Sequence, residues 1–148
     1  MKPVSIALFL FLCAVTLSAQ NDSSFANGQF TTSSGDDIRF SGRAHGGDVR
    51  GEITVTGSVT VKVDVDCFLA SGNRASLSGT IVESSMPELV GQRSLLVVED
   101  NGQGKNAADR FTWMPVSPAD CNAFPPASYV LEAIVDGHVH VKTSNAPF

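Results

Sequence analysis

The sequence predicts an all-β protein, an antiparallel meander of eight or nine strands forming a barrel or sandwich after an N-terminal signal peptide. Two observations predict this fold. Apolar residues recur at every second position in one segment after another, and glycine or asparagine turns separate these segments at intervals of about ten to fifteen residues. Helical periodicity is missing, which excludes helical bundles and folds that alternate strands with helices.

The clearest strand is "SVTVKVDVDCFLAS". Its apolar alternation is typical of an antiparallel strand with one buried face. We expect one face to carry Val59, Val61, Val63, Val65, Cys67 and Leu69. The opposite face should carry Thr60, Lys62, Asp64 and Asp66.

Three further segments alternate in the same way: "DIRFSGRA", "GEITVTG" and "NRASLSGTIV". Their predicted inward residues are Ile38, Phe40, Ala44, Ile53, Val55, Ala75, Leu77 and Ile81. Glycine-containing turns, at 46–47, 57–58 and 72–73, bound these strands. The segment "RSLLVVED" is apolar on both faces, which predicts a more central strand.

The C-terminal third predicts "RFTWMPV" as a strand and "YVLEAIVDGHVHVKT" as a hairpin. Asp136 and Gly137 lie between two alternating runs, and both central residues of a type I′ turn need positive φ. We therefore expect a two-residue turn at this pair. The stretch "SPADCNA" predicts a single helical turn.

The first residues indicate export. A single positive charge, Lys2, precedes the apolar run "VSIALFLFLCAVTLSA", which is too short for a comfortable membrane span and ends in small residues. Residues 1–19 are therefore interpreted as a signal peptide, whose cleavage would remove Cys13. Residues 20–148 are interpreted as a single all-β domain of secreted or periplasmic location.

Charge narrows the range of partners. Without Lys2 the exported chain has 9 basic and 15 acidic side chains, a formal charge of 9 − 15 = −6. Nucleic acid is not expected as a partner, because phosphate binding along a strand needs a clustered positive surface. No transmembrane span is expected after the leader, and one Trp and one Tyr make poor girdles for an outer-membrane barrel.

Two cysteines, Cys67 and Cys121, remain after the leader. Exported proteins meet oxidising conditions in which such a pair normally closes, so we predict a disulfide between them. The alternative, a reactive thiol acting as a nucleophile, would need a nearby base that the sequence does not identify.

The segments "VDVDCFLASGNRASLSGTIV", "VVEDNGQGKNAADRF" and "PADCNA" together resemble a family of small exported bacterial proteins of unknown function. Members of that family share a Val-x-Cys-Leu strand, a Gly-Asn-x-Ala turn and an Asp-Asn-Gly-x-Gly loop ahead of a second cysteine. Phe68 stands here in place of the leucine. The resemblance implies an exported, disulfide-bonded β domain and no particular activity.

The loop "EDNGQGKNAAD" is the first candidate site. Asp100, Asn101 and Asp109 could supply oxygen ligands to calcium, but their spacing does not match a calcium loop and Lys105 disfavours a dication. The glycines and Asn101 instead favour a wide hairpin connection with positive φ.

The second candidate is "HVH". His138 and His140 are two residues apart on a predicted strand, so both imidazoles project from one face, as zinc or copper ligands can. His45 and Asp136 are the candidates for a third ligand. The alternative is that Val139 and Val141 take the buried face and leave both histidines in solvent.

Catalytic motifs are missing. The chain has no Gly-x-Ser-x-Gly elbow, and the pair Asp64 and Asp66 lies beside Lys62 as an ordinary solvated surface would. We therefore predict a non-catalytic binding or structural domain, with no cofactor, that contacts a polar ligand or a cell-envelope component. The alternative is a metal-binding protein or metal-dependent enzyme that uses the strand with His138 and His140.

Overall fold

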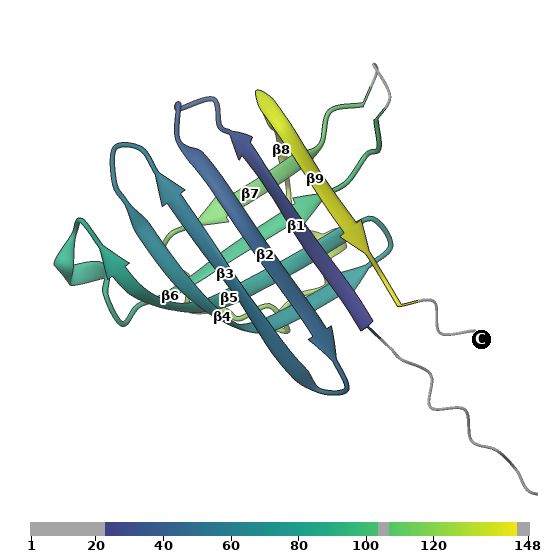
Figure 1. The fold of residues 1–148 in the computed structure, drawn as a ribbon, viewed down its shortest axis with the longest axis horizontal. Coiled ribbons are helices and arrows are strands. Elements are labelled where there is room, and N and C mark those ends of the chain that lie inside the picture. Colours follow the sequence, from purple (N-terminus) through teal and green to yellow (C-terminus); the bar gives the residue numbers. More distant parts are fainter. Residues whose placement is uncertain (1–22, 104–106, 145–148) are drawn as a thin grey trace, which may run out of the picture.

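The computed structural model describes residues 23–103 and 107–144, and these form a nearly all-β protein. Nine antiparallel strands make one sheet that curls into a half-barrel (Figure 1). The predicted signal peptide, residues 1–19, lies outside the described residues. The strands are β1 (Ser23–Thr31), β2 (Asp37–His45), β3 (Asp48–Thr56), β4 (Val61–Ser71), β5 (Arg74–Ser84), β6 (Arg93–Glu99), β7 (Arg110–Met114), β8 (Glu132–Ala133) and β9 (Asp136–Lys142).

The strand order is β8-β7-β6-β5-β4-β3-β2-β1-β9. The predicted meander is therefore confirmed as far as β8, and only the last strand departs from it by pairing with β1. Consequently β8 and β9, consecutive in the chain, lie at opposite edges of the sheet. Figure 1 shows β9 beside β1, with β6 and β7 crossing behind them.

The predicted hairpin at Asp136 and Gly137 is wrong. Both residues lie inside β9, opposite Thr31 and Phe30 of β1. Gly137 does have the positive φ that the turn prediction required, 108°, but the cause is different. A side chain there would collide with the backbone of Gln29 in β1.

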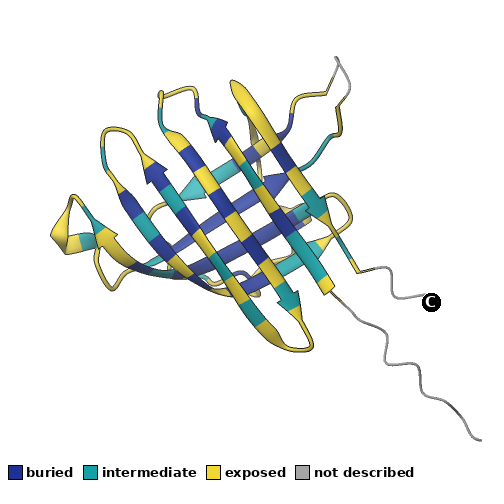
Figure 2. Ribbon diagram, in the orientation of Figure 1, coloured by how far each residue is buried: buried dark blue, intermediate teal, exposed yellow. Residues whose placement is uncertain are grey.

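The interior of the half-barrel is filled by side chains. All the predicted inward residues of β2, β3 and β5 lie in one apolar cluster, where Ala44 is half-buried and the others are buried. The Phe30 ring packs in this cluster, with its centroid 4.7 Å from that of Phe111 and 6.2 Å from that of Phe40. Figure 2 shows the buried positions alternating with exposed ones along β1, β2 and β3. One curled sheet, rather than two separate sheets, therefore encloses the core.

A β-bulge at Asp66 corrects the prediction for β4. Val65 pairs with Gly79 and Cys67 pairs with Ser78, so Asp66 is an extra residue in β4. A bulge reverses the alternation beyond it. Val61, Val63 and Val65 face the core as predicted, but Cys67 and Leu69 face outward and Phe68 enters the core instead.

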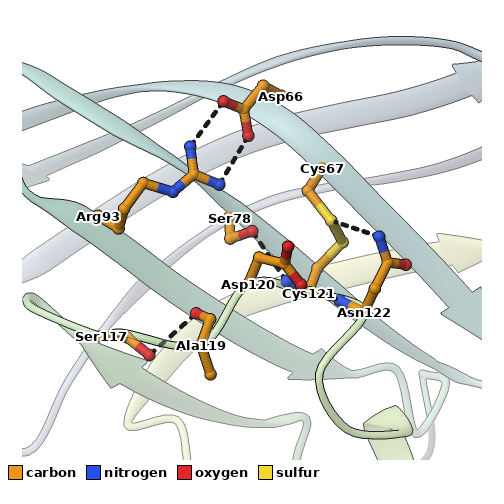
Figure 3. The surroundings of a disulfide bond; sticks show 9 residues. All are labelled: Asp66, Cys67, Ser78, Arg93, Ser117, Ala119, Asp120, Cys121 and Asn122. Atoms are coloured by element: carbon orange, nitrogen blue, oxygen red, sulfur yellow. Dashed lines mark hydrogen bonds and ion pairs between the residues drawn. A yellow bond between two sulfur atoms is a disulfide. The ribbon is translucent and has the colours of Figure 1, made fainter.

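Gly79 and Arg93 accommodate this bulge. A side chain at position 79 would collide with the backbone of Asp64, so only glycine permits the close approach. The Asp66 carboxylate accepts two hydrogen bonds from the Arg93 guanidinium, at 2.6 and 2.8 Å (Figure 3). Those bonds hold the pKa of Asp66 below its ordinary value.

Residues 115–131 form a cover over the outer face of β4, β5 and β6. Leu131 and Cys121 of this cover pack on Leu95 and Val97 of β6, which are fully buried. Strand β6 is therefore buried on both faces, as its sequence predicted. The cover contains the 3₁₀ turn η2 (Pro126–Ser128), whereas "SPADCNA" forms bends and turns rather than the predicted helical turn.

The Cys67–Cys121 disulfide joins the cover to β4, as predicted, with 5.7 Å between the two Cα atoms (Figure 3). Polar contacts surround it. The Cys121 N–H donates to the Ser78 hydroxyl at 2.9 Å, and the Asn122 amide donates to the Cys67 sulfur at 3.2 Å. The cover is thus attached covalently at one point and through hydrogen bonds on either side.

Arg74 of β5 forms the second attachment of the cover. Its guanidinium pairs with the Glu99 carboxylate and donates to the carbonyl oxygens of Pro126 and Tyr129, at 3.2 and 3.0 Å. Only 18% of the Arg74 side chain and 11% of the Glu99 side chain are exposed, so water screens this pair poorly.

Candidate binding cleft

The described parts of the connection between β6 and β7, residues 100–103 and 107–109, reach back to the free edge of β9. Asp109 is buried, and its two carboxylate oxygens accept hydrogen bonds from the N–H groups of Asn101 and Val139, at 2.8 and 2.7 Å. Asp100 accepts from the N–H groups of Gly102 and Val141, at 2.9 and 3.0 Å. The carboxylates of Asp109 and Asp100 therefore accept hydrogen bonds from two N–H groups of β9 that could otherwise pair with a further strand.

Asn101 fixes the shape of this connection. Its side-chain amide donates to the Glu99 carboxylate at 2.9 Å and to the Ala108 carbonyl at 2.8 Å, and its oxygen accepts from Asn73 at 3.2 Å. Gly102 has a positive φ of 79°. The predicted wide hairpin connection is confirmed, since β6 and β7 pair on either side of it. The positive φ expected at Asn101 is wrong, because every described residue with a positive φ is a glycine. Lys105 lies outside the described residues.

Glu99 is the buried carboxylate beneath the connection. Burial alone would raise its pKa, but hydrogen bonds from Asn101 and Arg74 lower it, and the pKa falls below the ordinary value of 4.5. The carboxylate is therefore held in its charged form by the same residues that shape the loop and attach the cover.

A cleft of about 910 Å³ lies between β9 and this connection, and we call it the β9 cleft. It lies at the surface of the half-barrel, because Val139 and Val141 turn inward while His138 and His140 face out. Its lining includes the side chains of Asn27, Asp100, Asp109, Ile134, Asp136, His138 and His140. The cleft therefore combines carboxylate, amide, imidazole and aliphatic groups.

The two histidines of β9 are exposed on its outer face. The alternation with Val139 and Val141 is confirmed. The His140 ring packs at 5.5 Å from the Phe25 ring, and its Nδ1 lies 3.4 Å from the Asp100 carboxylate. His138 is opposite Gln29 in the register of β1.

His45 does not join the other two histidines. It lies opposite Ser23 at the far end of β1, whereas His140 lies opposite Asn27, which is four residues away or roughly 13 Å along the strand. Within residues 23–103 and 107–144, no group of three or more His, Cys, Asp or Glu side chains is arranged to hold a metal ion. The oxygens of Asp100 and Asp109 instead accept backbone N–H groups.

Asp109→Asn is expected to destabilise the fold by about 2 kcal/mol, because the new NH₂ group would face a buried backbone N–H in place of an acceptor. Hydrogen exchange at the Val139 and Asn101 amides should accelerate. Denaturant unfolding and exchange measured by NMR check this. Asp136→Asn, the same change at an exposed position of β9, is the control. If the two variants had equal stability and equal exchange rates, the hydrogen bonds from Asp109 to the Val139 and Asn101 N–H groups would not stabilise the fold.

Sequence reasoning missed Asn27 and Phe25, which lie beside the histidines. Both are on the outer face of β1, and nothing in the sequence indicates that β1 pairs with β9.

Within the described ranges, no helix is long and apolar enough to cross a membrane. Compared with known proteins, the chain matches no protein-family model, no curated protein and no solved structure.

Proposed function

We propose that this chain is a secreted or periplasmic, non-catalytic binding domain that takes a polar, hydroxyl-rich ligand in the β9 cleft. The observation that carries the proposal is the cleft itself, with a volume of about 910 Å³ and side chains of mixed polarity. Volumes of this size are typical of small-molecule sites. A cell-envelope saccharide is the ligand class that we favour.

The chemistry of the lining supports a neutral ligand with many hydroxyl groups. A hydroxyl group both donates and accepts, and the Asn27 amide and the His138 imidazole can each do the same. Ile134 adds apolar surface on which a sugar ring can pack. Asp100, Asp109 and Asp136 make the cleft unfavourable for an anion.

Export is part of the same proposal. The disulfide supports it, because such bonds persist in oxidising compartments. The predicted signal peptide and the resemblance to small exported bacterial proteins point the same way. The chemistry proposed for the cleft does not depend on the compartment.

Titration with short uncharged oligosaccharides, hexose-based and N-acetylhexosamine-based, is the direct test. Binding should shift the NMR signals of Asn27, His138 and His140. Replacing Asn27 or His138 by alanine should weaken binding about tenfold, which corresponds to one lost hydrogen-bonding group of roughly 1.4 kcal/mol.

His45→Ala is the matched control, since His45 is exposed on the same face of the sheet but at the other end of β1. Its affinity should equal that of the unaltered chain. The proposal fails if neither oligosaccharide class shifts these signals, or if His138→Ala and His45→Ala bind alike.

A further inference from the structure

A row of positive side chains crosses the outer face of the sheet next to the β9 cleft, and Asn27 borders both. In register across four strands lie Lys142 of β9, Phe25 of β1, Arg43 of β2 and Arg50 of β3. The three charged residues are exposed and Phe25 is half-buried. The row holds no acidic residue, although the whole chain has a formal charge of −5.

The central pair of this row is electrostatically unfavourable. Arg43 and Arg50 are directly opposite one another, and like charges in that position destabilise a sheet. Arg50 has one partner, Asp48, at 3.1 Å, but both side chains of that pair are largely exposed and gain little from it. Among the described residues, Arg43 and Lys142 make no side-chain hydrogen bond or ion pair.

A groove of about 260 Å³ coincides with the row. Arg43, Arg50 and Phe25 border it, and the backbone of Gly42 and Gly51 contributes to its floor. Residues directly opposite one another on neighbouring antiparallel strands have their Cα atoms about 5 Å apart. At that spacing the guanidinium groups of Arg43 and Arg50 can both reach one anion. The Phe25 ring offers an apolar surface beside them.

We propose that this groove binds a phosphate-type oxyanion through Arg43 and Arg50, with Phe25 covering the apolar part of the molecule that carries it. Lys142 adds a third positive charge from the other side of Phe25. The anion would relieve the repulsion between the two guanidiniums, so binding should also stabilise the fold. This inference does not rest on the function proposed for the β9 cleft, whose acidic lining suits a different ligand.

Inorganic phosphate, compared with chloride at equal ionic strength, is the first probe. We expect it to shift the NMR signals of Arg43, Arg50 and their neighbours and to raise the Tm of the unaltered chain. The double variant Arg43→Gln/Arg50→Gln should lose both effects, with affinity reduced at least about tenfold. In the absence of phosphate, that variant should be no less stable than the unaltered chain, since a like-charge pair has been removed.

Arg39→Gln is the matched control. Arg39 is exposed on the outer face of the same strand, four residues from Arg43, and donates to Gln29. It should retain full phosphate binding. The proposal is overturned if phosphate produces no saturable shift, or if Arg39→Gln and the double variant lose binding equally.

A second arm identifies the source of the phosphate group. Phosphatidylcholine vesicles are compared with vesicles that also contain phosphatidylglycerol. Sedimentation with the anionic vesicles that requires Arg43, Arg50 and Phe25 would assign a lipid headgroup. Binding of inorganic phosphate without that sedimentation would assign a soluble phosphate compound, and Phe25→Ala would then leave inorganic phosphate binding intact.

Discussion

Replacing both Cys67 and Cys121 by alanine is expected to lower the free energy of unfolding by about 4 kcal/mol. The disulfide spans 54 residues, and a cross-link of that length removes a large part of the conformational entropy of the unfolded chain. The loss should appear as a lower midpoint in urea unfolding. Hydrogen exchange should also accelerate at Leu95 and Val97, whose side chains the cover buries.

Asn122→Ala is the control for this experiment, because it removes the neighbouring hydrogen bond to Cys67 but leaves the covalent bond. Its effect should stay within about 1 kcal/mol. A double cysteine variant that loses no more than Asn122→Ala would show that packing alone, through Leu131 and its neighbours, holds the cover in place.

Arg74→Ala is expected to destabilise the protein by about 3–5 kcal/mol, the range observed when one partner of a buried ion pair is removed. The change leaves the Glu99 carboxylate without its guanidinium and takes a donor from the Pro126 and Tyr129 carbonyls. Denaturant unfolding at neutral pH measures the effect. Arg93→Ala, which breaks the more exposed pair with Asp66, should cost less than Arg74→Ala, about 1 kcal/mol.

The pH dependence gives a second measure of the same pair. Because the folded-state pKa of Glu99 is lowered, its contribution is present above the ordinary value of 4.5 and is lost as pH falls through the lowered pKa. The difference in stability between the unaltered chain and Arg74→Ala should therefore shrink below pH 4.5. If the difference in stability stayed constant across that pH range, the Glu99 carboxylate would not be the partner that Arg74 stabilises. Arg74→Met/Glu99→Leu, which removes both charges, should be less destabilising than Arg74→Ala alone.

Local alternation was sufficient to predict most of the core. Ile38, Phe40, Ile53, Val55 and Leu77 face inward because each lies in a regular strand whose neighbours share its register. The prediction failed at Cys67, where one extra residue reverses the faces. The isolated glycine at position 79 is the signal that could have indicated this bulge, since a glycine inside a strand often marks a close backbone approach.

The candidate sites were harder to predict because they depend on contacts between distant segments. The alternation of "HVH" correctly placed His138 and His140 on the outer face. It could not show that β9 pairs with β1. It therefore could not predict that His45 lies far from His138 and His140, or that Asn27 lies beside them. The turn prediction at residues 136–137 failed for the same reason. A positive-φ glycine is required both in a tight turn and where another backbone approaches closely.

The carboxylates that bind the outer edge of β9 affect how one molecule of this protein can pair with another. An exposed strand edge normally offers its N–H groups to a strand of another molecule, which leads to domain swapping or fibrils. At Val139 and Val141 those groups are already bound by Asp109 and Asp100. An incoming strand would first have to displace two carboxylates and then leave their charge without a partner, so the β9 edge resists the addition of a strand from another molecule.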